Sequence, residues 1–108
     1  MSWPSPAATG CVIVWTYKVK AEYQALFEKT YSSTGEWALF FRKSAAYLGT
    51  ELYQDAHDPQ RYITSDYWTS EADYDAFCHQ YEAEYKAIDQ KCDAWTVEET
   101  LIGRFNRP

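Results

Sequence analysis

Hydrophobic and polar residues repeat along the chain with two different periods, and the changes of period mark its strands and helices. Residues 11–20 are rich in β-branched and aromatic side chains and contain no Gly or Pro, which is typical of a strand. Both faces of this strand begin with apolar residues, so we expect it to be central and covered on both sides. Residues 47–55 and 61–68 are predicted to be strands of a hairpin with an Asp-Pro turn, and residues 97–105 the last strand.

Three segments between these strands repeat their apolar residues every three or four positions, as an α-helix does. The first covers residues 21–31. A second, short helix follows, for which Ser33 and Glu36 have the spacing of a capping box. The third helix is expected to begin at Ser70 as N-cap, with Asp73 as its acidic N3 residue. We predict one continuous long helix here, because its apolar stripe keeps the period throughout: Tyr74, Phe77, Cys78, Tyr81, Tyr85, Ile88 and Cys92.

The order strand, helix pair, strand, strand, helix, strand is a split βαβ repeat. We therefore predict an α+β fold of the ferredoxin-like type, in which an antiparallel sheet carries helices on one face only. Residues 1–10 are rich in Ser, Pro and Ala and are expected to form a flexible leader before one domain over residues 11–106. No spare element remains to cover the other face of the sheet, so we expect a homodimer that buries it.

The charge balance narrows the class of partner. The 108 residues carry 16 acidic and 10 basic side chains, and 13 of the acids lie between positions 51 and 100 against three bases. This excess argues against binding to nucleic acid or to an anionic membrane surface. No apolar run reaches the length of a membrane span, and residues 1–10 lack the features of a secretory signal. Three widely spaced cysteines without metal-site spacing are typical of free thiols in the reducing cytoplasm.

Aromatic residues are strongly over-represented, at 19% of the chain. Most of them fall on helical stripes or strand faces, where packing on the sheet and a dimer seam explain them. The aromatic residues that remain for a ligand are Trp68, Tyr74, Trp15, Tyr17 and Tyr62.

The stretch YLGTELYQDAHDPQRYITSDYWTSEADYDAF resembles the signature region of the antibiotic biosynthesis monooxygenase-like superfamily of dimeric α/β-barrel proteins. In that family a Gly-Thr/Ser-Glu-Leu strand leads through a polar hairpin to an Arg-Tyr/Phe strand. This second strand ends in Trp-x-Ser before a helix that carries Tyr and Phe. The matching positions are Gly49, Thr50, Glu51, Leu52, Arg61, Tyr62, Trp68, Ser70, Tyr74 and Phe77. The resemblance covers residues 12–105 and implies the fold and the dimer.

The resemblance also implies oxidation of phenolic or hydroquinone substrates by molecular oxygen without metal, flavin or haem. Such a reaction needs a dry apolar pocket, donors that steady an anion, and a base or proton shuttle. Trp68 and Tyr74 match the Trp and Tyr implicated in quinone-forming members, whereas Thr64 stands at the position of their Asn. Their Arg falls near Ile88, which is not basic.

A haem-degrading branch of the same superfamily is not matched. Trp15, Phe77 and Ala87 stand where that branch has its Asn, Trp and haem-ligating His. We therefore expect neither haem nor any other cofactor, and no metal site.

Three residues are the catalytic candidates: Tyr74 to orient the substrate, Trp68 to stack on it, and His79 as the base that removes a phenolic proton. Asp75 lies four residues before His79, and a surface ion pair between them is the alternative for the histidine. The ligand-binding candidates are Trp15, Tyr17, Tyr62, Thr64, Phe77 and Arg42, the last as an anion clamp. Core or interface packing is the alternative for the aromatic candidates.

Two functions remain open from the sequence. The first is a cofactor-independent monooxygenase acting on an aromatic, polyketide-like or quinol substrate. The second is a non-catalytic dimeric domain that binds a small hydrophobic ligand, or a small structural protein. An enclosed pocket between sheet and helices, large enough for a ring and lined by Tyr hydroxyls, favours the enzyme, whereas a pocket filled by Trp and Phe favours the alternative.

Overall fold

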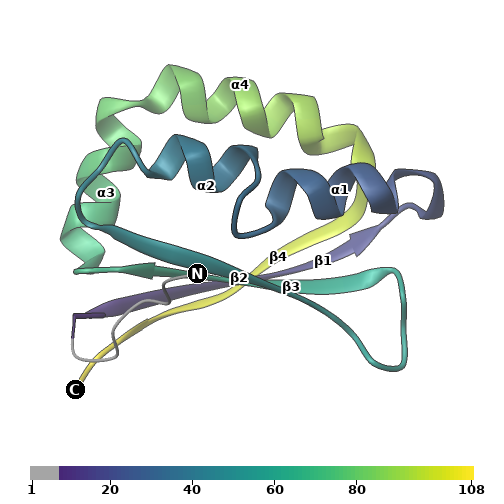
Figure 1. Cartoon of the computed structure of the whole chain (residues 1–108), viewed down its shortest axis with the longest axis horizontal. Helices are drawn as coiled ribbons and strands as arrows, with labels where there is room; N and C mark the ends of the chain where they lie inside the picture. Colours follow the sequence, from purple (N-terminus) through teal and green to yellow (C-terminus); the bar gives the residue numbers. More distant parts are fainter. Residues whose placement is uncertain (1–7) are drawn as a thin grey trace.

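The computed structural model describes residues 8–108, which form a four-stranded antiparallel sheet with helices on one face (Figure 1). The strands are β1 (Cys11–Val19), β2 (Tyr47–Gln54), β3 (Arg61–Trp68) and β4 (Thr96–Asn106). The helices are α1 (Gln24–Tyr31), α2 (Glu36–Phe41), α3 (Glu71–Gln80) and α4 (Glu82–Cys92), with 3-10 turns at Ala21–Tyr23 and Asp93–Trp95. The sheet order β2-β3-β1-β4 is that of the predicted ferredoxin-like fold, and β1 is central as expected.

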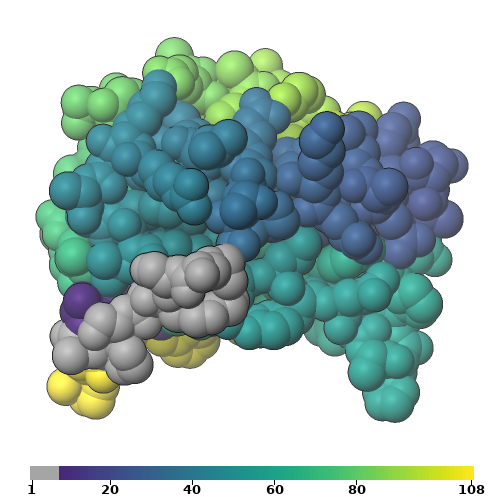
Figure 2. Space-filling model, viewed as in Figure 1, coloured from purple at the N-terminus to yellow at the C-terminus, as the bar shows by residue number. Residues whose placement is uncertain are grey.

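The apolar face of β1 that alternation predicts is the face that meets the helices. Its buried members are Cys11, Ile13, Tyr17 and Val19. The ring of Tyr17 meets Phe27 and Tyr31 of α1 edge-on, with both centroid distances 5.2 Å. Figure 2 shows α1 and α2 covering one side of the molecule, while the hairpin between β2 and β3 projects beyond the helices. The core therefore lies between the inner face of the sheet and the helical layer.

The long helix predicted after Ser70 is in fact two helices. Ser70 is the N-cap, and its Oγ accepts a hydrogen bond of 3.0 Å from the backbone N–H of Asp73, as predicted. The helix then breaks at Tyr81, whose backbone (φ −111°, ψ 31°) is not helical. Figure 1 shows the chain turning there, so that α4 runs over α2. A hydrophobic period cannot reveal this bend, because the apolar stripe continues through it with both helices facing the core.

The start of α2 also differs from the prediction. Its N-cap is Gly35, without a hydrogen bond from a capping side chain, so the capping box predicted for Ser33 and Glu36 is wrong. A side chain on Gly35 would lie 2.3 Å from the carbonyl oxygen of Thr30. The close approach of α1 to the start of α2 thus decides where the helix begins, and propensity alone does not.

Residues 1–7 of the expected leader lie outside the described residues. Gly10 is bonded on both sides: its N–H donates to the carbonyl of Trp68 and its carbonyl accepts from the N–H of Arg107, both at 3.0 Å. The ladder between β1 and its two neighbours therefore continues one residue before Cys11.

Candidate functional site

A narrow pocket lies between the inner face of the sheet and the helical layer, and it encloses about 430 Å³ of empty space, including the part open to solvent. Every strand and each of the four α-helices contributes to its wall. The residues from the sheet are Trp15, Tyr17, Thr50, Thr64, Asp66 and Glu99, and those from the helices are Tyr31, Trp37, Phe41, Tyr74, Tyr85 and Asp89.

The floor of the pocket carries a carboxyl group in the middle of the sheet. Asp66 of β3 lies between Ile13 of β1 and Thr50 of β2. The Thr50 hydroxyl donates to Asp66 Oδ1 at 2.5 Å, and since it has a single proton, it must accept from the hydroxyl of Tyr47, also at 2.5 Å. Asp66 Oδ2 takes no hydrogen bond from any residue in the range 8–108. One oxygen of a half-buried carboxyl is thus left for a ligand.

The electrostatic state of Asp66 follows from its position. Burial raises the pKa of its carboxyl from 3.8 to about 6, and the hydrogen bond from Thr50 opposes this shift only in part. A carboxyl with this pKa is ionised near pH 7, yet it accepts a proton more readily than an exposed aspartate does. Asp66 is therefore suited to act as a general base.

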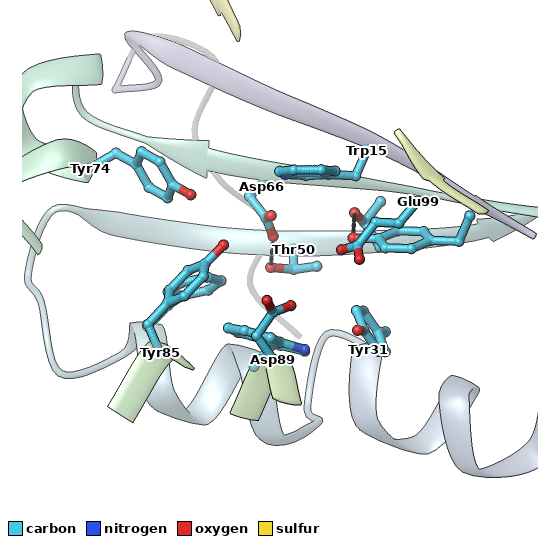
Figure 3. A pocket seen from close by; sticks show the side chains of 12 residues that line it. Trp15, Tyr31, Thr50, Asp66, Tyr74, Tyr85, Asp89 and Glu99 are labelled. Atoms are coloured by element: carbon cyan, nitrogen blue, oxygen red, sulfur yellow. Dashed lines mark hydrogen bonds between the residues drawn. The ribbon is translucent and has the colours of Figure 1, made fainter. Parts of the chain in front are cut away.

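Two tyrosine hydroxyls face the same space from the helices. Figure 3 shows the hydroxyls of Tyr74 (α3) and Tyr85 (α4) directed toward the region of Asp66 and Thr50. Burial, with smaller contributions from Tyr85 and Cys78, holds the pKa of Tyr74 well above its usual range, and burial raises the pKa of Tyr85 to about 12. Both groups keep their protons over the physiological range, so they can serve as hydrogen-bond donors.

Trp15 is the lining ring with an open face. Tyr17, Tyr31, Trp37, Phe41, Tyr74 and Tyr85 all make ring–ring contacts, such as the edge-on contact of Trp37 with Tyr85 at 5.1 Å. Trp15 makes no such contact with the aromatic residues of the described chain, and it is only partly buried. Its indole can therefore stack on a flat ligand without breaking an existing contact with another ring.

The remaining polar lining residues are acids that are exposed to solvent. Glu99 of β4 lies near Trp15 and Tyr31, and Asp89 of α4 lies below Thr50, between Tyr85 and Tyr31 (Figure 3). Partial burial raises the pKa of both carboxyls, and the charge of Asp93 contributes to both shifts. None of the twelve lining residues is basic. The pocket is thus an aromatic cleft with carboxylates on its floor and at its mouth.

Comparison with known proteins places this site in a family. The sequence profile described as antibiotic biosynthesis monooxygenase matches residues 11–90, about three quarters of the chain. The chain belongs to this monooxygenase family. The match contains β1 to β3 and nearly all of α4, and hence every lining residue except Glu99. A comparison with the sequences of curated proteins gives no match.

Solved structures of similar shape share the monooxygenase-family fold. A conserved protein from Methanosarcina mazei is 13% identical with a TM-score of 0.71, over 94% of this chain and 96% of that one. A candidate antibiotic biosynthesis monooxygenase from Nitrosomonas europaea is 16% identical with a TM-score of 0.68, over 90% and 97%. SnoaB, a cofactor-independent oxygenase from Streptomyces nogalater, is 18% identical with a TM-score of 0.66, over 93% and 94%. At these identities the likeness shows the fold alone.

Four of the site residues predicted from the sequence meet in this pocket: Trp15, Tyr17, Thr64 and Tyr74. Tyr17 and Thr64 are joined by a hydrogen bond between their hydroxyls at 3.2 Å. This settles which face of β1 carries Trp15 and Tyr17, because both side chains are on the helix side of the sheet.

Three other aromatic candidates lie outside the lining. Trp68 is completely buried against Phe41, Tyr74 and other rings, so it supports Tyr74 from behind, and Phe77 is buried in the same core cluster. Tyr62 borders a separate open groove along β2, where its hydroxyl donates to Glu28 at 2.5 Å.

The two charged candidates also lie away from the pocket. His79 is exposed on α3, and its expected partner Asp75 accepts instead from Arg104 of β4 at 2.8 Å. Arg42 is exposed after α2 and donates to the backbone carbonyl of Ser33 at 3.2 Å. Neither residue lines the pocket.

Asp66 lines the pocket but was not among the site residues predicted from the sequence. The signal was present, since Asp66 shares a strand face with Tyr62, Thr64 and Trp68, and a carboxyl amid such a face is costly unless it has a use. Tyr85, Asp89 and Glu99 carried no comparable signal, because they are ordinary positions of an amphipathic helix and of an edge strand.

Residues 8–108 contain neither a metal-site cluster nor a membrane-spanning helix. No group of three or more His, Cys, Asp or Glu side chains in this range has the arrangement of a metal site. No helix in the same range is long and apolar enough to cross a membrane.

Proposed function

We propose that this protein is a cofactor-independent monooxygenase that uses O₂ to oxidise a flat aromatic substrate of the phenol, quinol or polyketide type. The observation that carries the proposal is the pocket itself. In a chain of the monooxygenase family, it combines a half-buried carboxyl that has a free oxygen with two protonated tyrosines and an open indole face. These are the base, the donors and the stacking surface that oxidation of an electron-rich ring requires.

Asp66 is the base in this proposal. Its free Oδ2 accepts the phenolic proton, and the Thr50 hydroxyl stabilises the carboxylate through Oδ1. Removal of the proton gives an aromatic anion, which is electron-rich enough to pass an electron to O₂. The covering helices limit the access of water, which strengthens each polar contact in the pocket.

Tyr74 and Tyr85 stabilise the anion as it forms. Their raised pKa values keep the hydroxyl protons in place, so they donate hydrogen bonds and do not compete as bases. Trp15 stacks on the ring, while the buried Trp68 positions Tyr74 through an edge-on contact at 5.2 Å between ring centroids. In this proposal Tyr74 keeps its sequence-based role, whereas Trp15 takes the stacking role expected of Trp68, and Trp68 acts only through Tyr74.

The overall reaction balances without an added reductant. In an anthrone-type substrate a ring CH₂ becomes C=O. Two C–H bonds break, one oxygen atom enters the product, and the other leaves as water with the two hydrogens. The substrate supplies all four electrons that reduce O₂.

The alternative of a non-catalytic ligand-binding domain predicts a pocket filled by Trp and Phe. The wall instead contains four tyrosines, and Trp37 and Phe41 are its only rings besides these and Trp15. This lining supports the enzyme.

An oxygen-uptake assay tests the proposal. We expect the protein to oxidise anthrone- and hydroquinone-type substrates in air with a metal chelator present, and to be inactive under nitrogen. Isotope-labelled O₂ should place one labelled atom in the ketone product. kcat/KM should rise with pH to a plateau through an apparent pKa of about 6, because Asp66 must be ionised to accept the proton.

Variants assign the roles. Asp66→Asn is expected to lower kcat/KM by about 10²–10⁴-fold and Tyr74→Phe by about 10²-fold. Tyr23→Phe, in the 3-10 turn before α1 and outside the pocket lining, is the matched control. Loss of activity in His79→Asn with full activity in Asp66→Asn would assign the base to the histidine. If none of the pocket variants changed the rate of oxygen uptake, the proposed site would be refuted.

We also propose that the protein is a homodimer joined through the outer face of its sheet. This face carries apolar side chains that are open to solvent in one chain, including Tyr53, Ile63 and Phe105, of which 53%, 37% and 53% is exposed. The carboxylate of Glu51 accepts hydrogen bonds from the hydroxyls of Tyr53 and Tyr67 on the same face. The polar ends of these rings are therefore already satisfied, and their apolar parts are left for a second copy.

The cysteines support a place for the protein in the reducing cytoplasm. Cys11, Cys78 and Cys92 are all free thiols. Burial raises the pKa of each thiol, which keeps it protonated and slow to oxidise.

A further inference from the structure

We infer that the substrate carries a protonated amino group at the end of the molecule opposite to the reacting ring oxygen. The inference rests on the proposed function, because it names the class of substrate that this same pocket selects. The two ends of the pocket differ in chemistry.

One end is built for a hydroxyl. The Tyr74 and Tyr85 hydroxyls and the free Oδ2 of Asp66 converge there, as Figure 3 shows. A phenol at this end donates to the carboxylate of Asp66 and accepts from the two tyrosines.

The other end is built for a positive charge. Glu99 lies there near Trp15 and Tyr31, while Asp89 lies below Thr50, between Tyr85 and Tyr31. Carboxylates give an ammonium group its counter-charge, and the faces of Trp and Tyr attract cations through their quadrupoles. An aromatic wall together with carboxylates is therefore complementary to an amine on a flat ring.

The protein does not neutralise these acids itself. The seven ion pairs among residues 8–108 use Asp55, Asp58, Glu36, Glu71, Asp75, Glu82 and Glu84 as their acidic partners. Asp66, Asp89 and Glu99 take part in none of them. The nearby charge of Asp93 adds to the repulsion that Asp89 and Glu99 experience. A bound cation relieves this repulsion, whereas an anionic substrate increases it.

The reaction gives the same charge requirement. Transfer of the phenolic proton to Asp66 moves a negative charge from the carboxylate onto the substrate, in a pocket whose lining has no basic side chain. An ammonium group on the substrate brings the compensating charge, so that the substrate enters as a cation and becomes a zwitterion when its phenol is deprotonated. A substrate with a carboxylate would bring a further negative charge into a pocket that already contains three acids.

Binding of a matched series tests this inference. Tyramine, tyrosol and para-hydroxyphenylacetate share one phenol and a two-carbon side chain, and near pH 7 they are cationic, neutral and anionic. Titrations are followed by the NMR signals of the tryptophan indole N–H groups. We expect tyramine to bind about 2–5-fold more tightly than tyrosol, as a cation–π contact at a solvent-exposed site implies, and para-hydroxyphenylacetate to bind most weakly. The preference for tyramine should weaken with added salt.

Matched variants locate the source of the preference. Glu99→Gln should bring tyramine and tyrosol close to equal affinity, and Asp89→Asn should act in the same direction. Glu98→Gln removes the same charge from the next residue of β4, outside the pocket lining, and should preserve the order. Equal affinity of all three ligands for the unaltered protein would overturn the inference, and so would a preference that survives in Glu99→Gln.

The binding test and the oxygen-uptake assay can each fail without the other. A charge order without oxygen uptake would support the selectivity of the pocket and refute the monooxygenase. Oxygen uptake on anthrone-type substrates without a charge order would support the monooxygenase and refute the amine.

Discussion

Asp66 connects the stability of this protein with its proposed chemistry. Its carboxyl lies among rings and hydroxyls on the inner face of a central strand, where Thr50 is the one donor to it among residues 8–108. In the folded protein its pKa is about 6, compared with 3.8 for an aspartate in water. The folded state therefore binds this proton more tightly than the unfolded chain does. Asp66 contributes its full stability below about pH 4, and the contribution is lost as the pH rises through about 6.

Asp66→Asn is therefore expected to stabilise the fold near pH 7. The shift corresponds to at most about 3 kcal/mol, so we expect the free energy of unfolding to increase by about 1–3 kcal/mol at pH 7 and to change little near pH 4. Urea denaturation at both pH values measures this difference. Glu98→Gln, an exposed acid, should change stability by less than about 0.5 kcal/mol at either pH. A variant that is less stable than the parent at pH 7 would contradict the argument.

At the level of elements, one irregularity in β2 prepares the floor of the pocket. The pairing of β2 with β3 shifts between Tyr47 and Gly49, where Gly49 has a positive φ of 141°. Without this bulge, Tyr47 and Thr50 would lie on opposite faces, because they are an odd number of residues apart. With it, both side chains are buried on the helix side, and the chain of hydrogen bonds from Tyr47 through Thr50 to Asp66 can form.

Gly49→Ala should disturb this element. An L-residue is strained at this φ, so we expect the free energy of unfolding to fall by about 1–3 kcal/mol in urea denaturation. Gly103→Ala in β4 is the comparison, since its new methyl group meets the ring of Phe105, which is exposed and can turn away. An equal effect of the two substitutions would show that the bulge has no special requirement for glycine.

The break between α3 and α4 is a second irregularity with a consequence for the site. The turn at Tyr81 lets Tyr74 approach the pocket from α3 and Tyr85 from α4, with their hydroxyls on the same space. The ring of Tyr85 also meets Trp37 of α2 edge-on, so that α4 is held over the pocket. The donors in the proposed reaction thus come from two helices with different directions.

For the whole molecule, the two faces of the sheet have separate tasks. The inner face holds the core and the pocket. No helix of residues 8–108 lies over the outer face, which presents apolar side chains, with Lys18 of β1 and Arg61 of β3 side by side at one end. An exposed sheet face of this kind is typical of an interface, and the proposed dimer would cover it.

Sedimentation at micromolar concentration tests the dimer. We expect the unaltered protein to sediment as a dimer and Ile63→Arg to sediment as a folded monomer, because a charge at the centre of the outer face cannot be buried without a partner. Leu39→Arg places the same charge on α2, where the leucine is 59% exposed, and should remain a dimer. A monomeric parent protein would refute the proposed interface.

The sequence alone determined the strands, the order of the elements and the N-cap at Ser70, because alternation, helical periodicity and caps are local signals. It also identified Trp15, Tyr17, Thr64 and Tyr74 as candidates that meet in the pocket. Only the tertiary structure decided that Asp66 is the half-buried carboxyl at the floor and that Trp68 stands behind Tyr74. It also decided that His79 points away, and that the long helix breaks at Tyr81. These features depend on which parts of the chain pack together across the sheet, and no period along one segment contains that information.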